Sequence, residues 1–152
     1  LGIENVSSLR ELCEKVSGTG SLKYPREMIS KASLFQFGSD LTKDKVKVIH
    51  DRVCEGKEFL FSIDVKRGKL KLTSLSSSRL SQEKKNRVSI DFRLKSENLF
   101  SPGVAKADRG ILPGDEVIIM EKGGLRGFGE ALIAGQLMGS FTGLAVELIK
   151  LI

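Results

Sequence analysis

Glycine is concentrated in the C-terminal third of this chain, between short apolar runs, and this pattern limits the possible folds most strongly. Residues 97–152 hold ten of the 16 glycines and two of the three prolines of the 152-residue sequence. Residues 87–93 alternate apolar and polar side chains, and short strand-like segments bounded by glycine or proline follow at 117–120, 126–133 and 144–149. Many short strands separated by glycine predict a closed or nearly closed small barrel, because closure removes exposed strand edges.

The residues before this region follow a different pattern, with helices first and strands after them. Apolar residues recur every three or four positions over 3–16 and over 25–37, where Met28, Ile29, Ala32 and Phe35 would share one face. Pro25 suits the first turn of the second helix, and Gly38 suits its end. Period-two alternation then predicts three antiparallel strands around residues 46–48, 59–65 and 70–72, with turns at residues 55–56 and 67–68.

These patterns predict an α+β protein with two domains. We expect a helix-plus-antiparallel-sheet domain over residues 1–80, a linker over 81–86 and a small barrel domain over 87–152. The serine-rich segment at 74–86 is compatible with a short helix that leads into the linker.

Charge is divided unevenly along the same chain. Residues 1–96 carry 20 basic and 12 acidic side chains, whereas residues 97–152 carry five and seven. The net charge of +6 and the sequence pI near 9.4 favour acidic partners, and RNA is the first of these.

Composition argues against several other classes of protein. Cys13, Cys54 and His50 are too few for a structural zinc site, which needs four nitrogen or sulfur ligands. Unbroken apolar runs reach four or five residues, against about 20 for a membrane-spanning helix. We therefore expect a soluble, cytoplasmic protein that holds no metal or cofactor.

Ordered motifs in the C-terminal region resemble a known RNA-binding family. They are Asn98-Leu99-Phe100-Ser101-Pro102-Gly103-Val104, Ala107-Asp108-x-Gly110-Ile111-x-Pro113-Gly114-Asp115-Glu116-Val117, Gly129-x-Ala131-Leu132 and Thr142-Gly143-x-Ala145-Val146. Together they resemble the PUA domain, a pseudo-barrel found in many tRNA- and rRNA-modifying enzymes. The resemblance covers residues 87–152 and implies RNA binding. Residues 91–97 are too few for the helix usual between the first two strands, so that helix must be short or missing.

The front part is similar to the domain that precedes the PUA domain in archaeal tRNA-guanine transglycosylases of the archaeosine pathway. The similarity rests on Phe35-Gln36-Phe37-Gly38 after a helix, the hairpin over residues 59–73, and Arg79-Leu80. It implies tRNA as the ligand and a catalytic transglycosylase subunit as a possible partner. In that family the zinc site uses three cysteines and a histidine, so a chain with two cysteines cannot be the catalyst on its own.

Candidate RNA-binding residues come from two sources, the cations near the domain junction and the loop that the resemblance implies. They are Lys84, Lys85, Arg87, Arg93, Lys95, Asn98, Phe100, Ser101, Pro102, Gly103 and Lys106. The plainer alternative is that the cations form a solvated face and that Phe100 is part of the core. Gly110, Pro113, Gly114 and Asp115 are interpreted as a structural turn.

Three functions remain open at this point. The first is an RNA-binding protein that positions tRNA for a separate modifying enzyme. The second is a translation-associated factor that acts at the ribosome or on initiator tRNA. The third is an enzyme with Asp40, Asp44, His50 or Asp51 in an unrecognised site, although no nucleophile or phosphate-loop motif supports it.

Overall fold

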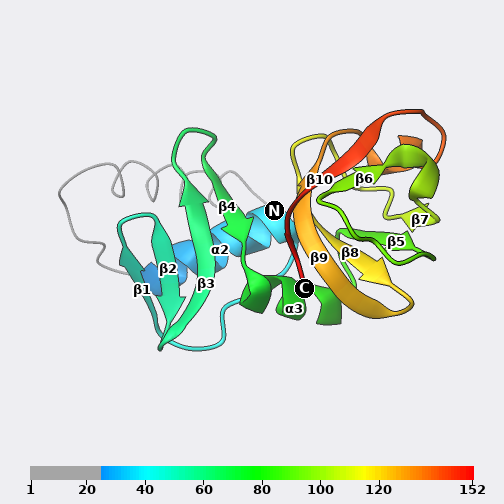
Figure 1. The fold of residues 1–152 in the computed structure, drawn as a ribbon. Coiled ribbons are helices and arrows are strands. Elements are labelled where there is room, and N and C mark those ends of the chain that lie inside the picture. The colour runs from blue at the N-terminus through cyan, green and yellow to red at the C-terminus, as the bar shows by residue number, and fades with distance from the viewer. Residues whose placement is uncertain (1–24) are drawn as a thin grey trace. The chain divides into compact units, whose positions relative to one another are not determined.

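The computed structural model describes residues 25–152 and divides into two units between Arg79 and Leu80 (Figure 1). The first unit has a four-stranded sheet and the second a six-stranded sheet. The predicted α+β class is confirmed. The helix expected over residues 3–16, with Cys13 in it, lies outside the described residues.

Helix α2, Pro25–Phe37, forms and ends as predicted. Gly38 adopts a φ of +69°, and its N–H donates to the Leu34 carbonyl at 3.0 Å, which closes the last turn. The prediction that Phe35 lies on the buried face was wrong, since Phe35 is 37% exposed. That face continues through Gln36 instead. The Gln36 side-chain amide donates a hydrogen bond to the Leu70 carbonyl at 2.6 Å and accepts one from the Leu70 N–H at 2.8 Å.

The first sheet is an antiparallel meander in the order β1-β2-β3-β4. Its strands are β1 Val46–Ile49, β2 Arg52–Glu55, β3 Glu58–Asp64 and β4 Lys69–Leu72. The turns at Gly56 and Gly68 are confirmed, with φ values of +63° and +64°. Strand β2 was not predicted, because it contributes one fully buried apolar side chain, Val53, beside the buried Glu55.

Strand β3 departs from the predicted alternation at one point. The β2–β3 register shifts between Val53 and Cys54, which face Phe61 and Phe59 respectively, so Leu60 is the extra residue. Leu60 and Phe61 are both fully buried, whereas Phe59 is 40% exposed. The period-two alternation predicted over residues 59–65 therefore fails at Phe59 and Leu60.

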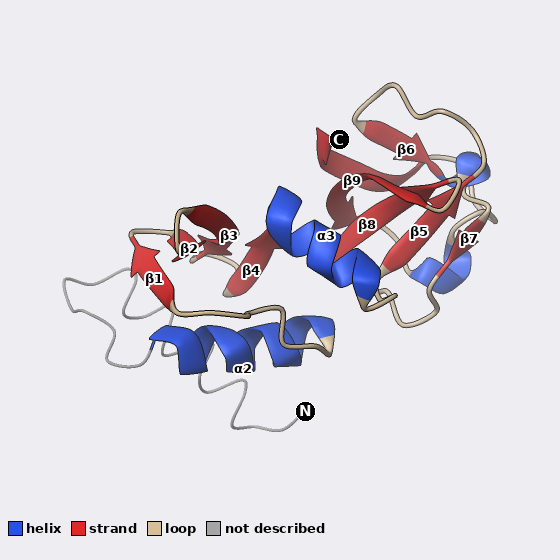
Figure 2. Cartoon of the chain, turned by 90° about the horizontal axis from the view of Figure 1, so that it is seen from below, coloured by secondary structure: helices blue, strands red, loops and turns tan. Residues whose placement is uncertain are grey.

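Helix α3, Ser74–Gln82, begins at a reciprocal cap. The Thr73 N–H donates to Ser76 Oγ at 2.8 Å, and the Ser76 N–H points back to Thr73 Oγ1 at 3.5 Å. The helix runs on through residues 81 and 82, the first two of the expected linker (Figure 2). No helix among the described residues is long and apolar enough to cross a membrane.

The second sheet curls into a half-barrel, in agreement with the barrel-like fold predicted for this region (Figure 1). Its order is β6-β10-β9-β8-β5-β7, with β5 parallel to β8 and the other pairs antiparallel. Only residues 101–105, which include the 3-10 turn η1 Ser101–Gly103, connect the edge strands β6 and β7. The strands are β5 Arg87–Ile90, β6 Asn98–Phe100, β7 Lys106–Ala107, β8 Glu116–Glu121, β9 Gly124–Ala131 and β10 Leu144–Leu151.

The half-barrel encloses an apolar core. Val88, Ile111, Val117, Ile119 and Val146 are fully buried members of it. A second 3-10 turn, η2 Gly135–Leu137, precedes β10.

Two expectations about the connections of this unit are confirmed. Residues 91–97 contain no helix. The turn before β8 is structural: the Leu112 N–H donates to Asp115 Oδ2 at 2.8 Å, and Gly114 adopts a φ of +90°.

Candidate nucleic-acid interface

A cleft of about 380 Å³ lies on the second unit, beside strand β5. Three cationic side chains line it, together with two hydroxyls and a small apolar wall. The lining residues are Ser81, Lys84, Arg87, Ser89, Ile90, Met120, Lys122 and Gly123. The parallel pairing of β5 with β8 sets Ser89 opposite Met120, which brings distant parts of the sequence together here.

Arg87 is held at the cleft by Asp108. Its Nη2 lies 3.6 Å from Asp108 Oδ1, and its backbone N–H donates to Asp108 Oδ2 at 2.9 Å. The Arg87 Nε is buried and has no hydrogen-bond partner among the described residues. A buried donor without a partner costs free energy.

Lys84 and Lys122 reach the cleft from unusual backbone positions. Their φ values are +56° and +51°, in the left-handed region that disfavours residues other than glycine, asparagine and aspartate. Both side chains are exposed, and neither forms an ion pair within residues 25–152. Their charges are therefore available to an anionic ligand.

A second surface surrounds the turn η1. Phe100, on the edge strand β6, is 55% exposed, and Phe141 is 52% exposed. The Ser101 N–H donates to the Gly143 carbonyl at 2.7 Å, and the Gly139 N–H donates to Ser101 Oγ at 2.9 Å. These bonds join the loop that carries Phe141 to the turn beside Phe100. We call the exposed residues of these two segments, Phe100 and Phe141 among them, the η1 surface.

The predicted loop residues do not all face solvent. Asn98 and Pro102 are exposed, as is Phe100. Ser101 is fully buried, and its hydroxyl accepts a hydrogen bond from the Gly139 N–H, so its side chain does not face solvent. A Cβ on Gly103 would lie 2.9 Å from the Phe92 ring, so the small size of Gly103 serves internal packing.

The remaining predicted cations do not line the cleft. Lys106 is exposed on β7, where it pairs in register with Ser89 of the cleft. Arg93 and Lys95 are exposed on the segment after β5. The residue between them, Leu94, anchors this segment, because its carbonyl accepts a hydrogen bond from the Arg126 side chain at 2.6 Å. Lys85 is partly buried, beside Lys84. Lys122 and Phe141 were missed from the sequence because each lies in a turn or loop far along the chain from its neighbours.

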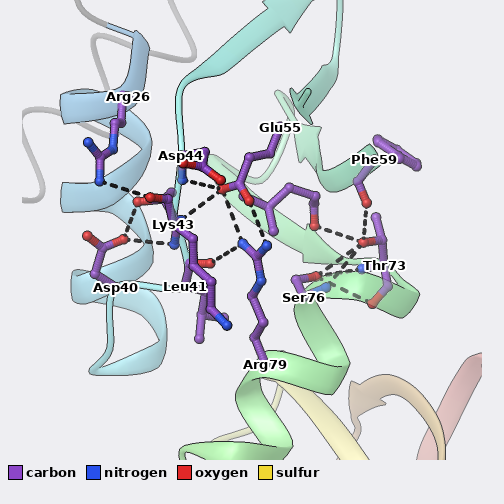
Figure 3. Close-up of polar contacts among 12 residues, drawn as sticks. Arg26, Asp40, Leu41, Lys43, Asp44, Glu55, Phe59, Thr73, Ser76 and Arg79 are labelled. Carbon is purple, nitrogen blue, oxygen red and sulfur yellow. Dashed lines mark hydrogen bonds and ion pairs between the residues drawn. The ribbon is translucent and has the colours of Figure 1, made fainter. Parts of the chain in front are cut away.

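The first unit uses its charges differently, in a buried cluster around Glu55 (Figure 3). Arg79 binds both carboxylate oxygens, at 2.6 and 3.1 Å, and donates to the Leu41 carbonyl at 2.8 Å. The N–H groups of Lys43 and Asp44 also donate to Glu55 Oε2. The Arg79 hydrogen bonds, against the opposing effect of burial, lower the pKa of Glu55 from 4.5 to about 2.

The residues of the enzyme hypothesis are not assembled into a site. Burial raises the pKa of Asp40, but hydrogen bonds from Ser30 and Thr42 outweigh it and leave the pKa below its ordinary value. Asp44, His50 and Asp51 are exposed. Between residues 25 and 152, no three His, Cys, Asp or Glu side chains gather in a way that could hold a metal ion.

Comparison with known proteins gives a family match for most of the second unit. Residues 86–152 match the PUA domain. This part of the chain is a PUA domain. A PUA domain implies RNA binding, which agrees with the exposed cations and aromatic rings described above.

Solved structures with the same fold cover most of the chain. A protein of unknown function is 24% identical, with a TM-score of 0.74 over 93% of this chain and 52% of its own. A hypothetical protein from the hyperthermophilic archaeon Pyrococcus horikoshii OT3 is 24% identical, with a TM-score of 0.69 over 87% of this chain and 93% of its own. A conserved PUA domain protein from Thermoplasma acidophilum is 20% identical, with a TM-score of 0.58 over 85% of this chain and 87% of its own.

These likenesses show the fold alone, and this chain spans about half the length of the first of the three proteins. The Pyrococcus and Thermoplasma chains are each covered over most of their length, so the pair of units recurs in them. A search of curated protein sequences gave no match.

Proposed function

We propose that this chain binds tRNA and positions it for a separate modifying enzyme, such as the catalytic subunit of a tRNA-guanine transglycosylase. The observation that carries the proposal is a PUA domain with two exposed phenylalanine rings and two exposed lysines, Lys84 and Lys122, that form no ion pair within residues 25–152. The similarity of residues 35–38, 59–73 and 79–80 to the domain before the PUA domain of archaeal transglycosylases supports tRNA as the ligand.

The chemistry of this surface suits binding and placement. Lysine and arginine side chains neutralise phosphates and release condensed counterions, which supplies affinity without reading the sequence. Phe100 and Phe141 offer flat apolar faces on which unpaired bases can stack. Together the two kinds of contact fix the orientation and register of a folded RNA, and the partner enzyme then acts on the nucleotide that is presented to it.

Binding to labelled tRNA across a range of salt concentrations tests the first half of the proposal. We expect tighter binding to folded tRNA than to an unstructured RNA of equal length, with affinity that falls steeply as salt rises. A flat salt dependence would contradict the role of the phosphates. Equal affinity for both RNAs would contradict recognition of folded tRNA.

Co-purification tests the second half. The proposal predicts that the tagged chain recovers a transglycosylase subunit from the cells that make it, and that tRNA modification slows when the chain is removed. If modification proceeds at the same rate without the chain, the positioning role is wrong. Sedimentation of the chain with ribosomal subunits, in place of a modifying enzyme, would favour the translation-associated alternative.

A further inference from the structure

We propose that the cleft beside β5 receives one unpaired nucleotide of the bound RNA. Its phosphate would lie against Lys84, Arg87 and Lys122, and its base against Met120. This inference rests on the proposed RNA binding and adds to it a specific feature of the RNA, a nucleotide outside the double helix. The η1 surface is a separate part of the domain and is not needed for this inference.

The dimensions of the cleft favour a single nucleotide over a helix. Its volume of about 380 Å³ falls within the range of roughly 300–1,000 Å³ that is usual for small-molecule sites. A double helix presents its phosphates on a broad outer surface, and its stacked bases cannot enter a cavity. An unpaired nucleotide can be turned out of the stack, which is how most proteins read particular RNA bases.

The charges of the cleft favour a phosphate. Its lining has three cations and no carboxylate, and Asp108, which pairs with Arg87, is not part of that lining. Lys84 and Lys122 carry charges without an ion-pair partner in the described part of the chain, and the Arg87 Nε has an N–H with no acceptor. A phosphate would be attracted by both lysines and by the Arg87 guanidinium beside them.

The backbone adds an independent argument. Lys122 and Gly123 both have positive φ values, +51° and +81°, at the turn between β8 and β9. Such two-residue turns usually carry Asn-Gly, because asparagine tolerates this conformation and lysine does not. A lysine at a strained position brings a positive charge to the cleft at some cost in stability, a pattern that is typical of functional sites.

The opposite part of the lining suits a base. Met120 and Ile90 supply apolar surface, and the polarisable methionine sulfur makes favourable contacts with aromatic rings. Ser81 and Ser89 supply hydroxyls that can donate or accept hydrogen bonds at a base edge or at a ribose hydroxyl. One nucleotide could use both kinds of wall at once.

The test compares two RNAs that differ in one nucleotide. The first is a short blunt RNA duplex, and the second is the same duplex with a single unpaired nucleotide in one strand. We expect the full chain to bind the second about tenfold more tightly, within the range measured for one stacked base. Fluorescence anisotropy at fixed salt gives both affinities.

The decisive variant is Lys122→Gly, which removes the charge and also relieves the strained backbone. Because glycine suits the turn, the melting temperature should stay equal or rise. The ratio of the two RNA affinities, which measures the preference for the unpaired nucleotide, should fall to less than half of its value in the unaltered chain. Two variants of the first unit serve as controls. His50→Gly relieves a φ of +54° in the first unit, and Lys57→Gln removes one exposed lysine there. Both should keep the full preference.

Each outcome distinguishes the two proposals. If Lys122→Gly weakens both RNAs by the same factor, the cleft only follows the phosphate backbone and the inference is wrong, although RNA binding stands. An unchanged preference in a folded Lys122→Gly variant also overturns it. If the unaltered chain binds neither these RNAs nor tRNA, the proposed function itself fails.

Discussion

The Glu55 cluster of the first unit and the cleft of the second use charged residues in opposite ways. In the first, Arg79 and Glu55 are 11% and 5% exposed and bind each other at 2.6 Å, and three backbone groups complete the cluster. In the second, Lys84 and Lys122 are exposed without an ion pair in the described residues and occupy strained backbone positions. A charge that is fully bonded inside the protein stabilises the fold, whereas a charge held at a cleft without a partner is available to a ligand.

The largest predicted effect concerns the buried pair. Arg79→Met removes the guanidinium and leaves the Glu55 carboxylate buried without its main partner, so the free energy of unfolding should fall by about 3–5 kcal/mol. Arg67→Met is the control, because Arg67 Nε lies 3.8 Å from Asp64 Oδ2 and 58% of the Arg67 side chain is exposed. This substitution should lower the free energy of unfolding by at most about 1 kcal/mol. Urea unfolding measures both. A loss below 1 kcal/mol in Arg79→Met would contradict a structural role for the cluster.

The same pair predicts a dependence of stability on pH. The pKa of Glu55 is about 2 in the folded protein against an ordinary value of 4.5, so its contribution is complete above pH 4.5 and is lost as the pH falls toward 2. The loss amounts to about 3 kcal/mol. In Glu55→Gln this part of the acid sensitivity should disappear, while the exposed Glu58→Gln should behave like the unaltered chain. Thermal unfolding at pH 5, 4 and 3 gives the comparison.

Glu55 also explains why part of the fold could not be predicted. The helix over 25–37, the strands β3 and β4 and the barrel-like curl follow from apolar periodicity and glycine positions, which are local signals. Strand β2 depends on a charged residue whose partner, Arg79, lies 24 positions away, so its sequence is typical of an exposed loop. The bulge at Leu60 is likewise set by pairing with β2 and has no signal of its own.

The candidate interface could be predicted only in part, for a similar reason. Lys84 and Arg87 were found because they lie close together in a basic stretch. Lys122 joins them through the parallel pairing of β5 with β8, which sequence spacing does not indicate. Phe141 joins Phe100 through backbone bonds between two loops. Ser101 shows the opposite case, because this small polar residue is fully buried and its hydroxyl accepts from the Gly139 N–H of another loop.

Substitutions on the η1 surface test whether the second unit also contributes aromatic contacts. Phe100→Ala and Phe141→Ala should each weaken the binding of tRNA by about 1–3 kcal/mol, the usual contribution of one stacked base. Both rings are more than half exposed, so the melting temperature should change little. Leu112→Ala is the matched control, because Leu112 is 62% exposed on another loop of the same unit. Equal losses at all three positions would mean that the rings have no specific role.

The smallest effect separates charge from backbone strain at Lys84. This residue lies two positions beyond the end of α3, where a left-handed residue often ends a helix and glycine or asparagine is usual. Lys84→Gln removes the charge and keeps the strain, whereas Lys84→Asn removes the charge and relieves most of the strain. Both should weaken RNA binding equally and reduce the salt slope by about 1, since one phosphate contact is lost. Only Lys84→Asn should raise the free energy of unfolding, by about 0.5 kcal/mol, because asparagine tolerates this conformation. If Lys84→Gln is as stable as Lys84→Asn, the backbone there is not strained. If neither variant changes the salt slope, Lys84 resembles the structural charges of the first unit more closely than a ligand contact.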